Sequence, residues 1–298
     1  MARITVVIPV YHGYSTLIKC LQCLAQNDYH DFRVLVVDHG PGTSGEVDRV
    51  EYPEGLDLSV LRASSNLWWT GATNVGIRKA LEEPVADYIM LLNDDCCLDK
   101  NAISTLVECA DKNEKSIVTP VQVDASTGKI LVRTAYTAYL LGFPTVIPPV
   151  IREKEQLPAV TRTGMIAGGR GVLIPGQTFR SVGLLNEKEL PHYGADNDFY
   201  LRCKAAGYHL FVSNQAKVYV DSARTTTASS VASLTLRQFL ATLTNRKSHR
   251  NIPDLLVHFR KHYPIPGLFP IGVILNLSRY VLIYILTRTV LLIRQTLS

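Results

Sequence analysis

The feature that most constrains this chain is the alternation of short apolar runs with helical patterns through its first two-thirds. Runs such as 3–10 and 32–37 are rich in β-branched and aliphatic residues, and segments of helical spacing separate them. Strands joined by helices of ten or so residues imply βαβ crossovers and a mainly parallel sheet. The sequence therefore predicts an α/β fold, a mainly parallel Rossmann-like sheet flanked by helices. The expected strands are 3–10, 32–37, 56–61, 87–92, 116–121 and 165–174, and the expected helices are 14–26, 71–81, 101–111 and 196–206.

The length of 298 residues suits one large α/β domain with an addition. The proline-rich stretch 140–158 is typical of a long surface loop. Beyond residue 227 we expect a helix over 232–244, a basic turn and a terminal apolar helix. We therefore divide the chain into a main domain, residues 1–227, and a helical extension, residues 228–298.

The charge is unevenly distributed, because residues 223–298 hold ten Lys or Arg and one acid, while the rest of the chain is mildly acidic. A basic tail indicates a polyanionic partner, either a membrane surface or nucleic acid. The tail is mainly aliphatic, which favours the membrane. On a helical wheel Arg279, Arg288 and Arg294 share one half and aliphatic residues fill the other, as in a helix that lies in the membrane interface.

Arg246, Lys247 and Arg250 would then face anionic head groups or the diphosphate of a lipid-linked acceptor. The alternative is a C-terminal helix that packs on the main domain or on a partner in a homodimer.

The six cysteines predict reduced thiols, because the N-terminal apolar run is too short for a signal peptide and the cytosol is reducing. Cys20 and Cys23 have the spacing of a metal or redox pair, but no second pair completes a site. We therefore expect both to be packing residues of a helix.

One group of polar residues directly follows a predicted strand, at Asn93, Asp94 and Asp95. Ligands of parallel α/β sheets bind beyond the carboxyl ends of strands. Crowded carboxylates repel one another unless a cation lies between them, and oxygen ligands suit Mg²⁺ or Mn²⁺. The other interpretation is a strand-to-turn corner in which these side chains only cap.

Further candidates are two carboxylates, Asp196 and Asp198, at the start of a predicted helix. They could cap that helix, with Asp198 paired to Arg202, or one could accept a proton from an attacking hydroxyl. Asp38 ends another strand, where a carboxylate can bind a nucleoside. The glycine pattern 40–45 matches a dinucleotide loop, but its position after the second strand argues against that function.

A loop-to-helix junction holds Asn66, Trp68, Trp69, Gly71 and Asn74. Backbone N–H groups of such a junction can meet a phosphate, and adjacent tryptophans can form a stacking wall for a sugar or base. Plain packing of the rings explains the pattern equally well.

Taken in order, Val6–Tyr11, Val36–Asp38, Asn66 to Gly76, Leu92–Asp95 and Tyr193–Asp198 resemble glycosyltransferase family 2. Within it the pattern is most similar to bacterial rhamnosyltransferase-like enzymes of surface polysaccharide synthesis. The resemblance covers residues 3 to about 221. It implies a GT-A fold, inversion at the anomeric carbon, a nucleotide-sugar donor and a divalent cation, Mn²⁺ or Mg²⁺.

Carried over by position, the resemblance implies roles for particular residues. Asp196 would be the catalytic base, with Asp198 as the alternative, and Asp95 with Asn93 would hold the metal. The residues implied in nucleotide or donor binding are Pro9, Tyr11, Asp38, Asn66, Trp69, Gly71, Asn74 and Asp94. The chain departs from the family pattern at Asn93, which replaces an acid, at Ala195, where glutamate is common, and at Asp221, where many members have histidine.

The expected activity is transfer of a sugar from dTDP-rhamnose or a UDP-sugar to a hydroxyl of a lipid-linked glycan at the cytoplasmic face of the membrane. Two other classes remain open. A glycoside hydrolase could use the same carboxylate pairs without a nucleotide. A nucleic-acid-binding protein would explain the basic tail, but we do not expect nucleic acid as a partner.

Overall fold

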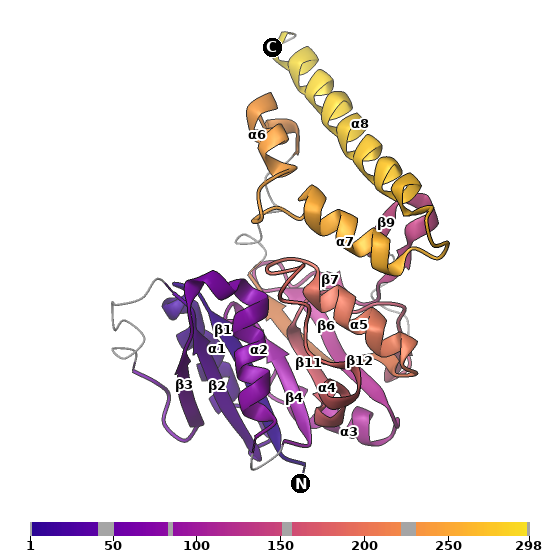
Figure 1. The fold of residues 1–298 in the computed structure, drawn as a ribbon. Coiled ribbons are helices and arrows are strands. Elements are labelled where there is room, and N and C mark those ends of the chain that lie inside the picture. The colour runs from indigo at the N-terminus through magenta and orange to yellow at the C-terminus, as the bar shows by residue number, and fades with distance from the viewer. Residues whose placement is uncertain (1, 41–50, 83–85, 151–156, 222–230, 297–298) are drawn as a thin grey trace. The chain divides into compact units, whose positions relative to one another are not determined.

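The computed structural model describes residues 2–40, 51–82, 86–150, 157–221 and 231–296 of the chain, without the side chains of residues 232 and 292–296. The glycine pattern 40–45 lies mostly outside the described residues. The chain divides into two compact units, residues 1–136 with 147–221, and residues 137–146 with 222–298 (Figure 1).

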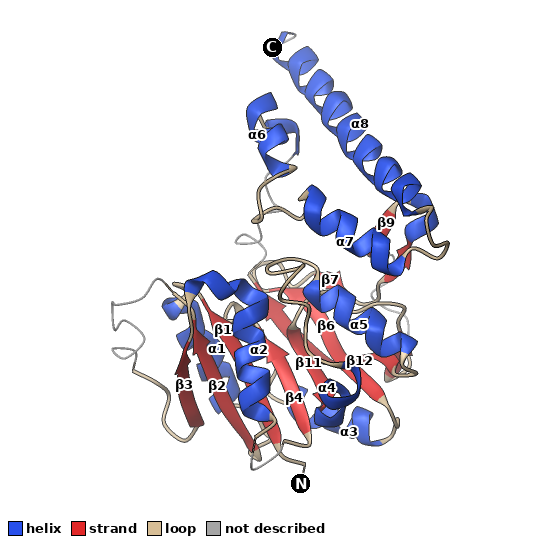
Figure 2. Cartoon of the chain, viewed as in Figure 1, coloured by secondary structure: helices blue, strands red, loops and turns tan. Residues whose placement is uncertain are grey.

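The first unit is built on a ten-stranded mixed sheet flanked by helices, so the predicted fold class is confirmed (Figure 2). Its path runs β10-β12-β6-β11-β4-β1-β2-β3, with β5 paired to β12 and β7 to β6. The strands are β1 Ile4–Val10, β2 Phe32–Asp38, β3 Asp57–Arg62, β4 Tyr88–Leu92, β5 Cys96–Leu98, β6 Ser116–Asp124, β7 Ile130–Val132, β10 Val160–Arg162, β11 Arg170–Pro175 and β12 His209–Val220.

The strands β3, β2, β1 and β4 are parallel, and β11 runs antiparallel between β4 and β6. The helices of this unit are α1 Tyr14–Ala25, α2 Trp68–Ala80, α3 Ala102–Asp111, α4 Gly176–Val182 and α5 Ala195–Ala205, with a short 3-10 turn η2 Ser65–Leu67. The predicted helices lie within a few residues of these bounds.

Side-chain alternation places helices on both faces of the sheet. Val6 and Ile8 of β1 join Leu21 of α1 and Leu106 of α3 in one buried cluster. The opposite face packs against α2, where Gly76 lies so close to Val7 and Val37 that a Cβ would collide with Val7. Burial on both faces explains why the strands are continuously apolar rather than alternating.

The cysteine expectation is wrong at one pair, because Cys23 of α1 and Cys97 of β5 form a disulfide with a Cα–Cα distance of 5.5 Å. Cys20, Cys96, Cys109 and Cys203 are free and buried. The sequence suggested packing for both Cys20 and Cys23, since a partner 74 residues away is not visible in local spacing.

The second unit contains a hairpin and three helices. Part of the stretch 140–158, predicted as a loop, instead forms β9 Phe143–Val146, which pairs with β8 Tyr136–Ala138; a 3-10 turn, η3 Tyr139–Leu141, lies between the two strands. The helices are α6 Leu236–Thr242, α7 Ile252–His262 and α8 Phe269–Thr296, with a 3-10 turn η6 Val231–Ser233. Phe239 of α6 stacks on Tyr280 and Tyr284 of α8, with ring centroids 4.8 and 4.1 Å apart.

Candidate active site

The predicted polar residues meet at one edge of the sheet. Asp38 ends β2, and Asn93 to Asp95 follow β4 directly. Because β2, β1 and β4 are parallel neighbours, their carboxyl ends lie side by side. Arg170 begins the antiparallel strand β11 opposite Leu92, so it enters the sheet at this same edge.

Asp38 is 7% exposed and its carboxylate is held on several sides. Oδ1 accepts from the backbone N–H of Gly40 at 3.0 Å and from Tyr14 Oη at 3.2 Å, and Arg62 Nη1 lies 3.4 Å from Oδ2. An ionised carboxylate fixed in this way is suited to orient a polar ligand.

His39 follows Asp38 and is buried, with its ring centroid 5.3 Å from that of Tyr11. Burial lowers the pKa of His39 to about 4, although the charge of Asp38 raises it. The imidazole is therefore neutral near pH 7 and forms a polar wall beside the exposed ring of Tyr11.

The Asn93–Asp95 segment is anchored from two helices. Trp69 Nε1 donates to Asn93 Oδ1 at 3.1 Å, so this tryptophan orients the amide. Asp94 Oδ2 lies against Gly13, at the position a Cβ would occupy, next to the first turn of α1. A larger residue in place of Gly13 would therefore displace this carboxylate.

The donor set at the end of β4 fits a divalent cation of the Mg²⁺ or Mn²⁺ type only in part. Among the described residues no group of three or more His, Cys, Asp or Glu side chains is placed to hold a metal. A Mg²⁺ ion bound with substrate phosphates needs only one or two carboxylates, which Asp95 and its neighbour Asp94 can supply. Asn93 can add one amide oxygen, which already accepts the indole hydrogen bond.

Asp196 lies in the first turn of α5 and is half-buried. Burial raises the pKa of its carboxyl, while the backbone N–H groups of Asn197 and Asp196 and the charge of Arg170 lower it. Asn197 N donates to Asp196 Oδ1 at 2.8 Å. A desolvated carboxylate has the character of a proton acceptor.

Asp198, the predicted alternative base, has no exposed surface. Its Oδ2 lies 2.9 Å from Arg202 Nε, and Arg202 also donates to the carbonyls of Val182 and Leu184. The predicted pairing of Asp198 with Arg202 is confirmed, and its function here is to join α5 to the end of α4.

Two residues predicted to bind the donor, Asn74 and Gly71, are buried. Asn74 is buried inside α2, where it donates to Leu185 O and accepts from Leu185 N. Gly71 is buried in the first turns of α2, and a Cβ there would lie 2.8 Å from Leu67 Cβ. Both residues are used by packing, since α2 begins at Trp68, three residues earlier than predicted.

The remaining donor-binding predictions lie around this edge. Pro9 is buried in β1, and Asn66 is exposed in η2. Trp68 has a positive φ of 53° and its ring centroid lies 5.5 Å from that of His192. The loop before α5 docks on α2, because Thr70 N and Oγ1 donate to Pro191 O and Leu190 O.

Sequence reasoning missed Arg170 and Gln122. Arg170 Nη1 donates to Gln122 Oε1 at 2.8 Å, and Gln122 is only 2% exposed. The visible signal was the cluster Gly168-Gly169-Arg170-Gly171 within the expected strand 165–174.

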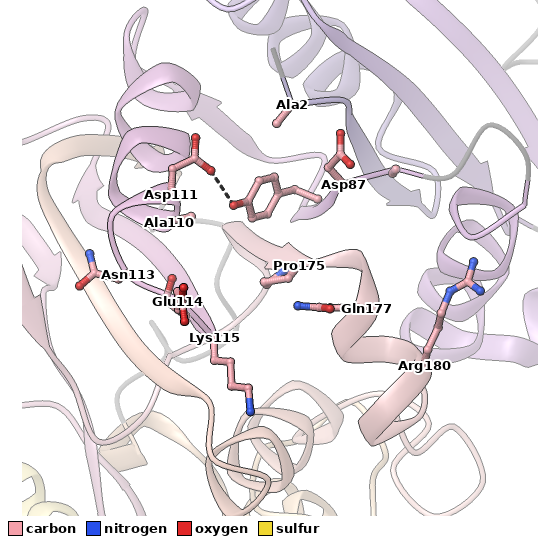
Figure 3. Close-up of a pocket in the computed structure, with 13 residues that line it drawn as sticks. Ala2, Asp87, Ala110, Asp111, Asn113, Glu114, Lys115, Pro175, Gln177 and Arg180 are labelled. Carbon is pink, nitrogen blue, oxygen red and sulfur yellow. Dashed lines mark hydrogen bonds between the residues drawn. The ribbon is translucent and has the colours of Figure 1, made fainter.

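A separate cavity of about 850 Å³ lies at the opposite edge of the sheet, where β4 and β6 begin (Figure 3). Asp87, Glu114, Lys115 and Arg180 contribute charged groups, and Tyr88 Oη donates to Asp111 Oδ1 across it at 2.8 Å. None of the predicted site residues lines this cavity.

The C-terminal helix α8 is long and apolar enough over Phe269–Leu291 to cross a membrane, with mean hydropathy 1.7 and 28% of its apolar window buried. Its buried positions include Asn276, Tyr280 and Tyr284. Ser278 and Thr289 are exposed and polar, but most exposed positions are aliphatic: Ile271, Ile274, Leu275, Val281, Leu282, Ile283, Ile285, Leu286 and Val290.

The arginines predicted for the membrane interface differ in their surroundings. Arg279 lies over the ring of Phe143 at 3.4 Å and donates to the carbonyls of Leu141 and Gly142, so it has protein partners. This corrects the expectation that its guanidinium faces head groups. Arg288 is half-buried, and the side chain of Arg294 lies outside the described residues.

The fold of the first unit is of the GT-A type, and comparison with known proteins identifies the family of the chain. Residues 5–180 match the family described as Glycosyl transferase family 2, which is more than half of the chain. The chain therefore belongs to glycosyltransferase family 2.

Two curated relatives are bacterial. Glycosyltransferase GlyG of Streptococcus pneumoniae is 26% identical over 116 residues, 39% of this chain and 37% of the relative. The amylovoran biosynthesis glycosyltransferase AmsB of Erwinia amylovora is 32% identical over 94 residues, 30% of each chain. The aligned part spans about a third of the length of these relatives.

Solved structures share the fold. A mannosyltransferase from Pyrobaculum calidifontis in complex with GDP-Man and Mn²⁺ superimposes with TM-score 0.61 at 14% identity, covering 100% of this chain and 76% of that one. GalNAc-T7 with UDP, GalNAc and Mn²⁺ gives 0.62 at 18% identity, covering 74% and 44%. S. aureus TarS 1–349 with UDP-GlcNAc gives 0.55 at 13%, covering 93% and 72%.

Proposed function

We propose that this chain transfers a sugar from a nucleotide-sugar donor, dTDP-rhamnose or a UDP-sugar, to a hydroxyl of a lipid-linked glycan, with inversion at the anomeric carbon. The observation that carries the proposal is that Asp38 and Asn93–Asp95 lie at one sheet edge of a family 2 chain, where β11 begins at Arg170, whose charge acts on Asp196. The bacterial relatives, one of them named for amylovoran biosynthesis, support a polysaccharide pathway.

The nucleoside binds beside Asp38 in this proposal. The carboxylate is already oriented by Tyr14, Gly40 and Arg62, so it can accept from a ribose hydroxyl or a base N–H without reorganisation. The half-exposed ring of Tyr11 and neutral His39 form the wall on which the base would lie.

Asp95, with Asp94 and Asn93, would hold a divalent cation, Mn²⁺ or Mg²⁺. When bound, this ion supplies Lewis-acid stabilisation of the diphosphate charge. Trp69 keeps the Asn93 amide oxygen at a fixed place through its indole hydrogen bond. Three structural neighbours are complexes with nucleotides or nucleotide sugars, which supports a donor of this class.

Asp196 is the proposed base. Its carboxylate accepts the proton of the acceptor hydroxyl, the oxygen attacks C1 of the donor sugar, and the C1–O bond to the diphosphate breaks on the opposite face. The electron pair of that bond leaves on the nucleoside diphosphate. Desolvation raises the pKa of Asp196, so its carboxylate is a stronger proton acceptor than that of an exposed aspartate.

The second unit is proposed to lie on a membrane surface. The exposed face of α8 is aliphatic, and Arg246, Lys247 and Arg250 are exposed elsewhere in the same unit. An apolar helix face with basic neighbours is suited to anionic lipid and to the diphosphate of a lipid-linked acceptor. The cytoplasmic side was expected partly from reduced cysteines, and the Cys23–Cys97 disulfide removes that argument.

The test is a turnover screen of the full chain with UDP-, dTDP- and GDP-sugars, with Mn²⁺ or Mg²⁺ and a short lipid-linked acceptor. Release of nucleoside diphosphate that depends on both donor and metal is the expected result. A chain that releases none from any donor, while binding none, contradicts the proposal.

A further inference from the structure

Arg170 occupies a position in the site that the proposed roles leave unused. It is paired in register with Leu92, the residue before Asn93, and a β-bulge follows between Arg170 and Val172. Gly171 in this bulge has φ of 77°. Bulges of this kind re-aim a side chain at the end of a strand.

The segment before Arg170 is fastened by three elements. Gln122 of β6 donates to Ala167 O at 2.6 Å, and Tyr200 Oη of α5 donates to Gly168 O at 3.2 Å. A Cβ on Gly169 would lie 3.1 Å from the ring of Trp69. The guanidinium is therefore held on a rigid support and not on a free loop.

Arg170 lies near residues on both sides of the site. It is opposite Leu92, the residue before Asn93, and its charge opposes the burial that raises the pKa of Asp196. Within the described residues its guanidinium contacts the uncharged Gln122 and has no carboxylate within ion-pair distance. Arg170 is half-buried and donates to the described part of the protein only through Nη1, so most of its N–H donors are left for a ligand.

We propose that Arg170 binds the diphosphate of the nucleotide-sugar donor and stabilises the negative charge that develops on the leaving phosphate. This inference rests on the proposed function. When the acceptor oxygen bonds to C1 and the C1–O bond breaks, the electron pair and its charge pass to the phosphate oxygen. The planar guanidinium fork matches two phosphate oxygens, and preorganised donors of this kind stabilise charge as it forms.

The position of Arg170 also accounts for the missing acid in the Asn93–Asp95 segment. The family pattern has an acid where this chain has Asn93, so one negative charge fewer is present to hold a cation. An arginine beside this loop adds positive charge to the diphosphate site directly.

The test measures affinity for UDP, dTDP and GDP by titration calorimetry, with Mn²⁺ and again with EDTA, on the full chain. Arg170→Gln should weaken binding of the preferred nucleoside diphosphate 10- to 100-fold in both conditions. Arg170→Lys keeps the charge without the fork and should lie between. Arg162→Gln, on the exposed strand β10 where Arg162 contacts His209, is the matched control and should bind as the wild type does.

Three outcomes separate the ideas. If wild-type chain binds no nucleoside diphosphate, the proposed function fails and this inference with it. If wild type binds and Arg170→Gln binds within twofold of it, only this inference is overturned. If the variant loses affinity for the nucleotide sugar but keeps that for the free diphosphate, Arg170 contacts the sugar instead, which also overturns the proposal. If Arg170→Gln does not fold, Arg170→Lys is measured in its place, and binding by it within twofold of wild type overturns this inference.

Discussion

Asp196 and Asp198 are two positions apart on α5, yet their surroundings assign them different functions. Asp196 lies half-buried in the first turn, where burial raises its pKa and the charge of Arg170 lowers it. Asp198 points inward, has no exposed surface and is paired with Arg202. Each residue of an α-helix is rotated by about 100° from the one before it, so residues two positions apart differ by about 200°, which places the two carboxylates on opposite sides of the helix.

Asp198→Asn should destabilise the fold by about 3–5 kcal/mol, because it leaves the Arg202 guanidinium without its buried counter-charge. Glu82→Gln, which removes the exposed ion pair with Lys79, is the control and should change stability by about 0.5 kcal/mol or less. Denaturant unfolding measures both. Equal stability of the Asp198 variant and the wild type would contradict a structural function.

At single residues the sequence predicts the strand-end acids better than the residues that support them. Asp38 and Asn93–Asp95 follow apolar runs, and the rule for parallel sheets locates them. Asn74 could not be distinguished from a ligand-binding amide, because its partner Leu185 lies 111 positions away. Arg170 was missed for the same reason, since its placement depends on pairing between β11 and β4.

At the scale of elements, α1 and β5 are joined by the Cys23–Cys97 disulfide just beyond the Asn93–Asp95 segment. Reduction of this bond should lower stability by about 2–4 kcal/mol, because the bond closes a long loop in the unfolded chain. For a unit of this size the corresponding fall in Tm is about 4–16 °C. Thermal unfolding with and without a reductant measures it.

The double variant Cys23→Ser with Cys97→Ser is the matched control, and its Tm should not respond to reductant. A wild-type Tm that is the same in both conditions would contradict a stabilising disulfide.

The helix α7 carries the single acid of the tail, Asp254, which is 6% exposed. Burial raises its pKa to about 6, although the charge of Arg246 lowers it. The folded state thus binds a proton between about pH 4 and pH 6 that the unfolded state has released. Stability of this unit should therefore fall as the pH rises through that window and stay lower above it.

Asp254→Asn should remove this pH dependence and raise stability at pH 7 by about 1–3 kcal/mol. The measurement is the free energy of unfolding of wild type and variant at pH 4.5 and pH 7.5. A variant that loses stability at pH 7.5 would show that the ionised carboxylate, paired with Arg246, stabilises the fold.

Element boundaries were predictable where periodicity was long, as in α1, α3 and α5. The hairpin β8–β9 was not, because prolines at 144, 148 and 149 indicated a loop. Its contacts come from α8, where Asn276 donates to Gly142 O at 2.8 Å. A contact between residues more than 130 positions apart leaves no trace in local sequence.

At the scale of the whole molecule, the acidic and basic parts of the chain correspond largely to the two units. The first unit carries the carboxylates of the candidate site, and the second carries the basic residues with the apolar face of α8. The residues of the candidate site thus lie in the mildly acidic unit, and those proposed to bind a membrane surface lie in the basic unit.

Leu282→Glu with Leu286→Glu should reduce binding to anionic phospholipid vesicles on the order of 100-fold, because two exposed leucines no longer insert. Leu157→Glu changes an exposed leucine of the first unit and serves as the control. Vesicle flotation measures binding. Equal flotation of the double variant and wild type would contradict attachment through this face.

The central claim is that Asp196 accepts the acceptor proton in a nucleotide-sugar-dependent transfer. The most direct measurement is the rate of product formation by Asp196→Asn, beside its affinity for the donor. The account predicts a loss of at least about 10²-fold in kcat with donor affinity within a few-fold of wild type. Near-normal turnover by Asp196→Asn would contradict it.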